Sequence, residues 1–162
     1  MKSVTNKSVG LITNKKDYLY LDWADDGARI FSQCSKRQYF CIIVSWDGSV
    51  ISTGYNGAPS GMQNCNDGGC PHSSETPSER ANDYNTCVAI HAEENALLRA
   101  DWSRLFGGTL YVNGLPCFGC AKKIAGTTLT RVVVKNEPEL SYPGWPQVEK
   151  FLLDSKKGVI VL

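Results

Sequence analysis

Two short stretches of the chain carry residue types that commonly bind a transition metal. Residues 91–95 read HAEEN and residues 116–120 read PCFGC. His91, Cys117 and Cys120 offer one imidazole and two thiolates, a donor set that suits Zn²⁺. Three protein ligands leave a fourth tetrahedral position open, as in catalytic rather than structural zinc sites. The pattern therefore predicts activation of a water molecule, because zinc lowers the pKa of a bound water from about 15.7 to about 7.

The spacing of these residues predicts that the metal lies where two helices begin. Cys117 and Cys120 are three residues apart, so their thiols share one face of a helix, and a helix N-terminus favours the thiolate. Glu93 follows His91 by two positions, a rotation of roughly 200° on a regular helix. The two side chains converge only at a helix start, where Glu93 could move protons beside the metal without binding it.

The cysteine pair taken alone has other interpretations. A CxxC motif also suits a redox protein or half of a structural zinc site. The upstream His-Ala-Glu and the proline before the first cysteine disfavour both, because H-x-E followed by P-C-x-x-C is the signature of zinc-dependent nucleobase deaminases. A purely structural zinc site would also have no use for Glu93, a carboxylate that lies beside the metal without binding it.

The resemblance extends well beyond this signature. Five segments occur in the order typical of one family: GYNGAPSG at 54–61, HAEENA at 91–96, TLYV at 109–112, PCFGCAKKI at 116–124 and YPGW at 142–145. From about residue 17 to residue 162, the sequence resembles the deoxycytidylate deaminase family, within the zinc-dependent cytidine/deoxycytidylate deaminase superfamily. The resemblance implies zinc-dependent hydrolysis of dCMP to dUMP and ammonia, which supplies the precursor of dTMP. Glu93 would act as general acid and base, carrying protons from water to N3 of the cytosine and to the leaving amine.

The resemblance also implies a set of substrate contacts. Asn56 would bond the sugar with Gly57 beside it, although Asn-Gly is also typical of a tight turn. The Ala92 N–H would bond the base, and the Leu115 carbonyl would receive the departing amine. Tyr142 would stack on the base or else pack against a nearby tryptophan. No phosphate partner is predicted, because Arg29, Arg37 and Lys135 are interpreted as ordinary surface charges.

Further cysteines suggest a second, closed metal site. Its candidate ligands are Cys34, Cys65, Cys70, His72 and Cys87. The resemblance supports such a site, since some phage and bacterial members of the family carry a structural zinc. Four ligands would order the polar loop 62–86; the alternative is a flexible loop with free thiols. The fourth ligand is either Cys70 or His72. Cys41, in the apolar run FCIIV, is predicted to be a core residue.

The elements that must position these residues follow from the pattern of apolar residues. Helices are predicted over 17–33, 88–101, from Pro116 onward and over 147–154, and strands over 39–44, 50–54, 109–112, 131–134 and 159–162. Asp47-Gly48 predicts a hairpin turn between the first two strands. The later alternation of helix and strand predicts a three-layer α/β/α domain with a central mixed sheet of about five strands. This is the cytidine-deaminase-like architecture that the resemblance implies, as one domain over 1–162 with a flexible segment at 1–16.

Composition narrows the classes of partner and location. The chain has 162 residues, with Lys+Arg 17 and Asp+Glu 16, so it lacks the basic excess of a duplex-binding groove. This balance also disfavours an editing deaminase that tracks tRNA or single-stranded DNA. The N-terminus has no sustained apolar run, which predicts no signal peptide or membrane anchor and a reducing cytoplasm.

Some alternatives stay open at the level of sequence. The substrate could be another pyrimidine nucleotide or nucleoside, such as a 5-modified dCMP, because the zinc chemistry is common to all of them. A non-catalytic zinc-containing nucleotide-binding module is disfavoured by Glu93. The resemblance further implies a homo-oligomer, commonly a hexamer, with dCTP and dTTP as effectors.

Overall fold

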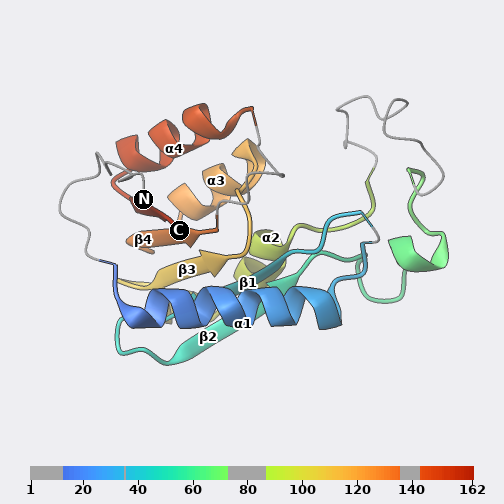
Figure 1. Ribbon diagram of the computed structural model, residues 1–162, viewed down its shortest axis with the longest axis horizontal. Coiled ribbons are helices and arrows are strands. Elements are labelled where there is room, and N and C mark those ends of the chain that lie inside the picture. Colours follow the sequence, from blue (N-terminus) through green and yellow to red (C-terminus); the bar gives the residue numbers. More distant parts are fainter. Residues whose placement is uncertain (1–12, 35, 73–86, 136–142) are drawn as a thin grey trace, which may run out of the picture.

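The computed structural model describes residues 13–34, 36–72, 87–135 and 143–162. Five strands form a single sheet in the order β2-β1-β3-β4-β5 (Figure 1). The strands are β1 (Phe40–Val44), β2 (Val50–Tyr55), β3 (Thr109–Val112), β4 (Arg131–Val134) and β5 (Gly158–Val161). β1 pairs antiparallel with β2 and with β3, whereas β3, β4 and β5 are parallel. The predicted mixed sheet of five strands is confirmed.

Helices cover both faces of this sheet. The helices are α1 (Lys15–Phe31), α2 (Ala92–Arg99), α3 (Phe118–Ala125) and α4 (Trp145–Asp154), with short 3-10 helices η1 (Cys65–Asp67) and η2 (Trp102–Arg104). Helix α1 lies along one face, and α3 and α4 lie on the other (Figure 1). Residues of α2 share the core on the side of α3 and α4. This arrangement is the predicted three-layer α/β/α architecture.

The apolar run of β1 shows why the sheet is buried on both sides. All five of its residues are buried. Phe40 and Ile42 belong to the core beneath α1, whereas Cys41 and Ile43 belong to the core beneath α2, α3 and α4. Alternate side chains of a strand point to opposite faces, so a strand covered on both faces must be apolar throughout. The predicted role of Cys41 as a core residue is confirmed.

Helix boundaries differ from the prediction at identifiable places. Helix α1 begins at Lys15, inside the segment expected to be flexible, because Asn14 and Asp17 form a capping box. Helix α2 spans only Ala92–Arg99, four residues later at its start than the pattern predicted. Helix α3 begins at Phe118, two residues after the proline that was expected to open it. The remaining ends agree to within one or two residues, which is the usual uncertainty of such boundaries.

The first helix is anchored by a buried charge. Asp17 has no exposed surface, and its carboxylate accepts hydrogen bonds from Tyr111 Oη at 2.9 Å and from Arg131 Nη2 at 3.0 Å. Tyr111 lies on β3 and Arg131 on β4. One carboxylate thus ties α1 to the two central parallel strands.

The turn between β1 and β2 is also as predicted. Gly48 has a φ of 88°, a value that glycine adopts readily, and the strands on either side pair antiparallel. Across the described ranges, no helix has both the length and the apolar character needed to cross a membrane.

Candidate active site

His91 lies where the sequence places it, at the start of α2. It is the N-cap residue, with an extended backbone of φ −67° and ψ 154°. Glu93 follows in the first helical turn. Because His91 precedes the regular helix, the two side chains are not bound by the rotation of about 200° that two helical steps impose.

The two cysteines meet this histidine from a second helix. Cys117 is the N-cap of α3, and Cys120 lies in its first turn. His91 Nδ1 is 3.5 Å from Cys117 Sγ and 3.4 Å from Cys120 Sγ. All three ligand atoms lie within 4.8 Å of one another.

The geometry of this triad fits zinc. Zn–S bonds of about 2.3 Å and Zn–N bonds of about 2.0–2.1 Å, at the tetrahedral angle, place sulfur and nitrogen about 3.5 Å apart. The two nitrogen–sulfur distances of 3.5 Å and 3.4 Å match this value. Cys120 is buried and Cys117 partly buried, whereas His91 is exposed. The cluster is therefore open to solvent on the histidine side, where a small molecule could approach.

The electrostatics of the triad favour a thiolate. The hydrogen bond from Cys120 lowers the pKa of Cys117 to about 3, against the opposing effect of burial. The same hydrogen bond raises the pKa of Cys120, and the hydrogen bond with Cys117 raises the pKa of His91. Cys117 also accepts a hydrogen bond from the Cys120 N–H at 3.4 Å. The helix start thus holds negative charge on sulfur, which is the form that binds a metal.

Glu93 lies beside the triad in a dry environment. Its side chain is 5% exposed. Burial raises the pKa of Glu93, while the neighbouring His91 opposes that rise. A buried carboxyl with a raised pKa exchanges protons more readily near neutral pH than an exposed one, which is the property that a general acid and base requires.

Asn56 has an unexpected set of partners. Its Oδ1 accepts hydrogen bonds from Ser32 Oγ at 2.6 Å and from the Tyr39 N–H at 2.9 Å. Its Nδ2 donates to the Arg37 carbonyl at 2.6 Å. An amide nitrogen has two N–H groups, so one donor is left over for a substrate. The side chain mainly holds the segment that connects α1 to β1.

Of the other expected substrate contacts, Gly57, Ala92 and Leu115 lie within the described residues, whereas Tyr142 does not. Gly57 and Asn56 both have negative φ, so the dipeptide does not form the positive-φ turn that Asn-Gly favours. Gly57 instead forms a two-way backbone bridge with Ile90, the residue before His91. Ala92 is the first residue of α2, where an N–H has no partner within the helix. Leu115 lies between β3 and the cysteine pair and packs against the core.

Tyr142 falls outside the described residues. Of the three cationic residues considered as partners of the phosphate, two form ion pairs with aspartates of α1. Arg29 pairs with Asp26 on the surface of α1, and Lys135 pairs with Asp25 of the same helix. The Arg37 carbonyl accepts a hydrogen bond from Asn56; this contact uses the backbone of Arg37 and does not engage its guanidinium.

Two contacts near the triad were not predicted. Glu94 forms an ion pair with Lys123 at 2.9 Å. This pair joins α2 to α3, one residue after Glu93 and three after Cys120. Asn95 is buried, and its Nδ2 donates to the Tyr55 carbonyl at 2.7 Å. Only the last residue of the HAEEN motif could have signalled this bond, since asparagine is an unusual choice for a helix interior.

A second group of thiols lies away from the first. Sulfur atoms of Cys65, Cys70 and Cys87 all lie within 4.8 Å of one another. Burial raises the pKa of Cys65 to about 12, and the nearby Cys34 thiol adds to that rise. Between the two residues considered for the last ligand, Cys70 belongs to this group and the His72 imidazole does not.

Comparison with known proteins assigns the family. Residues 14–136 match the family profile described as the cytidine and deoxycytidylate deaminase zinc-binding region. The chain belongs to this deaminase family. It is 44% identical over 103 residues to the deoxycytidylate deaminase of Saccharomyces cerevisiae, which covers 63% of this chain and 32% of that protein. It is 40% identical over 110 residues to the deoxycytidylate deaminase of Mycobacterium phage D29, which covers 65% of this chain and 84% of that protein.

The fold of the family is shared with a solved structure. The crystal structure of the dCMP deaminase of cyanophage S-TIM5, in complex with dCMP and dUMP, superposes with a TM-score of 0.69 at 23% identity, covering 94% of this chain and 100% of that one. The chain spans about a third of the length of the yeast relatives that it matches. The matched region of this deaminase family includes His91, Glu93 and both cysteines, so the donor set occurs in a zinc-binding family.

Proposed function

We propose that the protein deaminates deoxycytidylate, with dCMP and water giving dUMP and ammonia. The observation that carries this proposal is the convergence of His91, Cys117 and Cys120 within 4.8 Å at two helix starts, beside a glutamate that is 5% exposed. The relatives named as deoxycytidylate deaminases support dCMP as the substrate. A 5-modified dCMP or a free nucleoside is the competing substrate, and the assay below separates them.

The residues of the chain have distinct tasks in this reaction. His91, Cys117 and Cys120 would hold zinc, which when bound makes a water molecule acidic enough to react near neutral pH. Glu93 would accept one proton of the attacking water and deliver it to N3 of the cytosine as the C4–O bond forms. It would then take the proton of the hydroxyl on C4 and pass it to the amine, whose bond to C4 breaks. The buried position of Glu93 keeps bulk water from competing for these protons. Glu93 alone would therefore serve as the proton carrier to N3 and to the leaving amine.

The substrate would be held by backbone and amide groups. The Ala92 N–H donates to the base, and the remaining Nδ2 N–H of Asn56 donates to the sugar. The Leu115 carbonyl accepts from the departing amine. Gly57 contributes through its bridge to Ile90, which joins the sugar-binding segment to the histidine.

Zinc content and ammonia release, measured together, test the proposal. Glu93→Gln keeps the size of the side chain and removes its proton transfer, so we expect kcat on dCMP to fall by about 10²–10⁴-fold with zinc retained. Cytidine and 5-methyl-dCMP serve as comparison substrates. Full activity in Glu93→Gln would exclude Glu93 as the proton carrier. Faster turnover of cytidine or 5-methyl-dCMP than of dCMP would assign that compound as the substrate instead.

A second zinc is proposed at the other thiol group. Cys65, Cys70 and Cys87 supply three ligands, and Cys34 is the proposed fourth, although its sulfur lies outside the group of atoms within 4.8 Å of one another. Four thiolates leave no open position, so this metal would stabilise the fold without taking part in the reaction.

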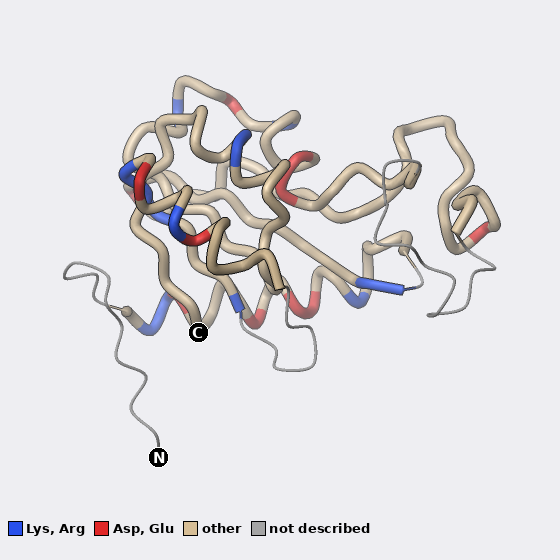
Figure 2. The backbone as a smooth tube through the Cα atoms, turned by 90° about the horizontal axis from the view of Figure 1, so that it is seen from above, with Lys and Arg blue, Asp and Glu red and all other residues tan. Residues whose placement is uncertain are grey.

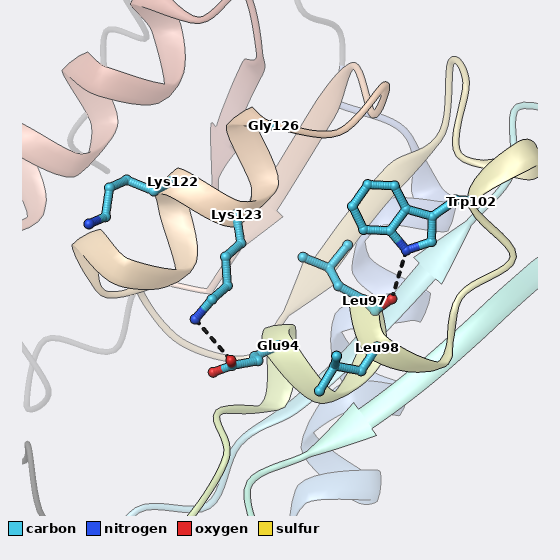
Figure 3. A pocket seen from close by; sticks show the side chains of 7 residues that line it. All are labelled: Glu94, Leu97, Leu98, Trp102, Lys122, Lys123 and Gly126. Atoms are coloured by element: carbon cyan, nitrogen blue, oxygen red, sulfur yellow. Dashed lines mark hydrogen bonds and ion pairs between the residues drawn. The ribbon is translucent and has the colours of Figure 1, made fainter.

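Self-association is proposed through a groove between α2 and α3. The groove has a volume of about 320 Å³ and is lined by Glu94, Leu97, Leu98, Trp102, Lys122, Lys123 and Gly126 (Figure 3). Leu98 is 69% exposed and Trp102 60% exposed. Glu94 and Lys123 neutralise each other within the chain, so the groove offers mainly apolar surface, which a two-fold axis would place against the same surface of a second copy. A second copy of the chain is therefore the proposed occupant.

The effectors and the location stay predictions. Addition of dCTP and dTTP to the deamination assay tests the first, with activation by dCTP and inhibition by dTTP as the expected pair of responses. A cytoplasmic location fits the seven cysteines, which are all thiols in the structure, and fractionation of cells tests it.

A further inference from the structure

One glycine of β2 lies where a side chain has no room. A Cβ atom at Gly54 would come within 2.3 Å of the Ala92 carbonyl oxygen and within 2.3 Å of the Ala96 nitrogen. Both are backbone atoms of α2 or its first turn, so neither can rotate away. Non-bonded heavy atoms settle at about 3.5–4.0 Å, so accommodating any side chain would require α2 to move from the sheet by roughly 1 Å.

Hydrogen bonds on both sides of Gly54 hold the helix at this distance. Ser52 Oγ donates to the Ala96 carbonyl at 2.8 Å. Asn95 Nδ2 donates to the Tyr55 carbonyl at 2.7 Å. The position of α2 is therefore set by its close approach to the backbone of β2 at Gly54 and by these two hydrogen bonds from short side chains to backbone carbonyls.

The other half of the metal cluster is supported elsewhere. Helix α3 packs against α4 through Phe118 and Phe151, whose ring centroids are 5.0 Å apart. Its buried residues Ala121 and Ile124 lie in the main core. Helix α3 touches α2 through the Glu94–Lys123 ion pair and the shared core, but its packing on α4 is separate from α2, so a displacement of α2 would be followed by α3 only in part.

We propose that Gly54 is a positioning residue, whose missing side chain sets the distance of His91 and Glu93 from Cys117 and Cys120. The inference rests on the proposed metal chemistry of this cluster. It states that Gly54, a residue without a functional group, determines the geometry of the cluster. A side chain at position 54 lengthens the nitrogen–sulfur distances of 3.5 Å and 3.4 Å. It also moves Glu93 relative to the substrate, and a misplacement of about 1 Å can cost roughly 100-fold in rate.

Gly54→Ala tests this directly, with Gly126→Ala as the matched control. A Cβ at Gly126 meets its nearest atom, the Lys123 carbonyl oxygen, at 3.4 Å, so that variant adds the same methyl group without a clash. Zinc affinity is measured by competition with a chromophoric chelator, and the visible spectrum of the cobalt-substituted protein reports ligand geometry. The second thiol group, formed by Cys65, Cys70 and Cys87, would also bind zinc or cobalt. Its metal signal is measured in Cys117→Ser, which lacks one ligand of the first cluster, and is subtracted from the signal of each variant.

We expect Gly54→Ala to keep the circular dichroism of the wild type, to bind zinc about 10–100-fold more weakly and to show an altered cobalt spectrum. Its kcat should fall by about 100-fold, with KM changed far less. Gly126→Ala is expected to keep the zinc affinity and cobalt spectrum of the wild type; because Gly126 lines the groove proposed for self-association, the comparison with it is limited to these two metal readouts. Ser52→Ala loosens the same contact without adding atoms; if Gly54→Ala does not fold, a roughly 10-fold weaker zinc affinity in Ser52→Ala is the expected result.

Wild-type zinc affinity and cobalt spectrum in Gly54→Ala, or in Ser52→Ala where it replaces that variant, would overturn the inference. Failure of the proposed function is a separate outcome. A wild-type protein that binds zinc but releases no ammonia from dCMP would refute the reaction, while the metal measurements would still decide the role of Gly54.

Discussion

At the scale of single residues, the chemistry of the site was predictable and its support was not. His91, Glu93, Cys117 and Cys120 carry groups whose capacity to bind a metal or move a proton is evident from residue type, so their types and spacing were enough to predict a metal cluster. Gly54 and Asn56 act through what lies around them. Their partners come from α2 and from the segment before β1, and only the folded chain brings these together.

Asn56 is expected to contribute to both stability and binding. Asn56→Ala removes three hydrogen bonds to Ser32, Tyr39 and Arg37 and leaves buried polar groups unpaired. We expect the free energy of unfolding, measured with urea, to fall by roughly 2–4 kcal/mol.

Asn113→Ala is the matched control for this prediction. Asn113 is also buried, and its amide bonds the Phe40 N–H and the Gln38 carbonyl on the same segment. A sugar contact predicts a larger KM for dCMP in Asn56→Ala than in Asn113→Ala. Equal KM values in the two variants would restrict Asn56 to its structural role.

At the scale of elements, periodicity predicted the four described α-helices and five described strands, but neither the two 3-10 helices nor how α1 is attached. The strands over 109–112 and 131–134 were predicted with the correct ends, because short β-branched and aromatic runs between turn residues have few alternatives. The pairing of Asp17 with Arg131 joins residues 114 positions apart. No local pattern reports such a pair, and an acidic residue near a helix start reads as a surface charge.

Removal of this buried charge should weaken the fold. Asp17→Asn keeps the shape of the side chain but leaves Arg131 without its charged partner, so we expect the free energy of unfolding to fall by about 3 kcal/mol. Asp154→Asn is the control, because Asp154 pairs with Lys150 across a surface where the two side chains are 64% and 74% exposed. That change should cost less than about 1 kcal/mol, and an equal loss in both variants would contradict a special role for Asp17.

The thiol group around η1 should be separable from the reaction. Cys65→Ser removes one ligand of the proposed structural zinc, so we expect the zinc content to fall by one per chain and the Tm to drop. The kcat of the remaining folded protein should stay near that of the wild type. Loss of activity in step with zinc, while the protein stays folded, would assign these thiols to the reaction instead.

At the scale of the whole molecule, charge and apolar surface point to different partners. Basic and acidic residues are interspersed along the described backbone (Figure 2), in keeping with a net charge of +1. Attraction to a polyanion therefore does not follow from overall charge. The exposed Leu98 and Trp102 of the groove between α2 and α3 favour a protein surface as partner.

The proposed self-association can be tested on this groove. Leu98→Glu places a charge in the apolar part of the groove, and we expect the molar mass from light scattering to fall to that of a smaller assembly. Leu153→Glu is the control, since Leu153 is 41% exposed on α4 and does not line the groove. An unchanged mass in Leu98→Glu, or an equal fall in both variants, would exclude the groove as the interface.

The distant partners of Asp17 also bear on the order in which the chain is made. Helix α1 is synthesised well before its partners in the sheet, since the Asp17 carboxylate bonds Tyr111 and Arg131, which follow 94 and 114 residues later. At about 5–20 residues per second, translation reaches Arg131 roughly 6–23 s after Asp17. Throughout that interval water must solvate the carboxylate. Helix α1 therefore completes its contacts with the sheet only after Arg131 has been synthesised.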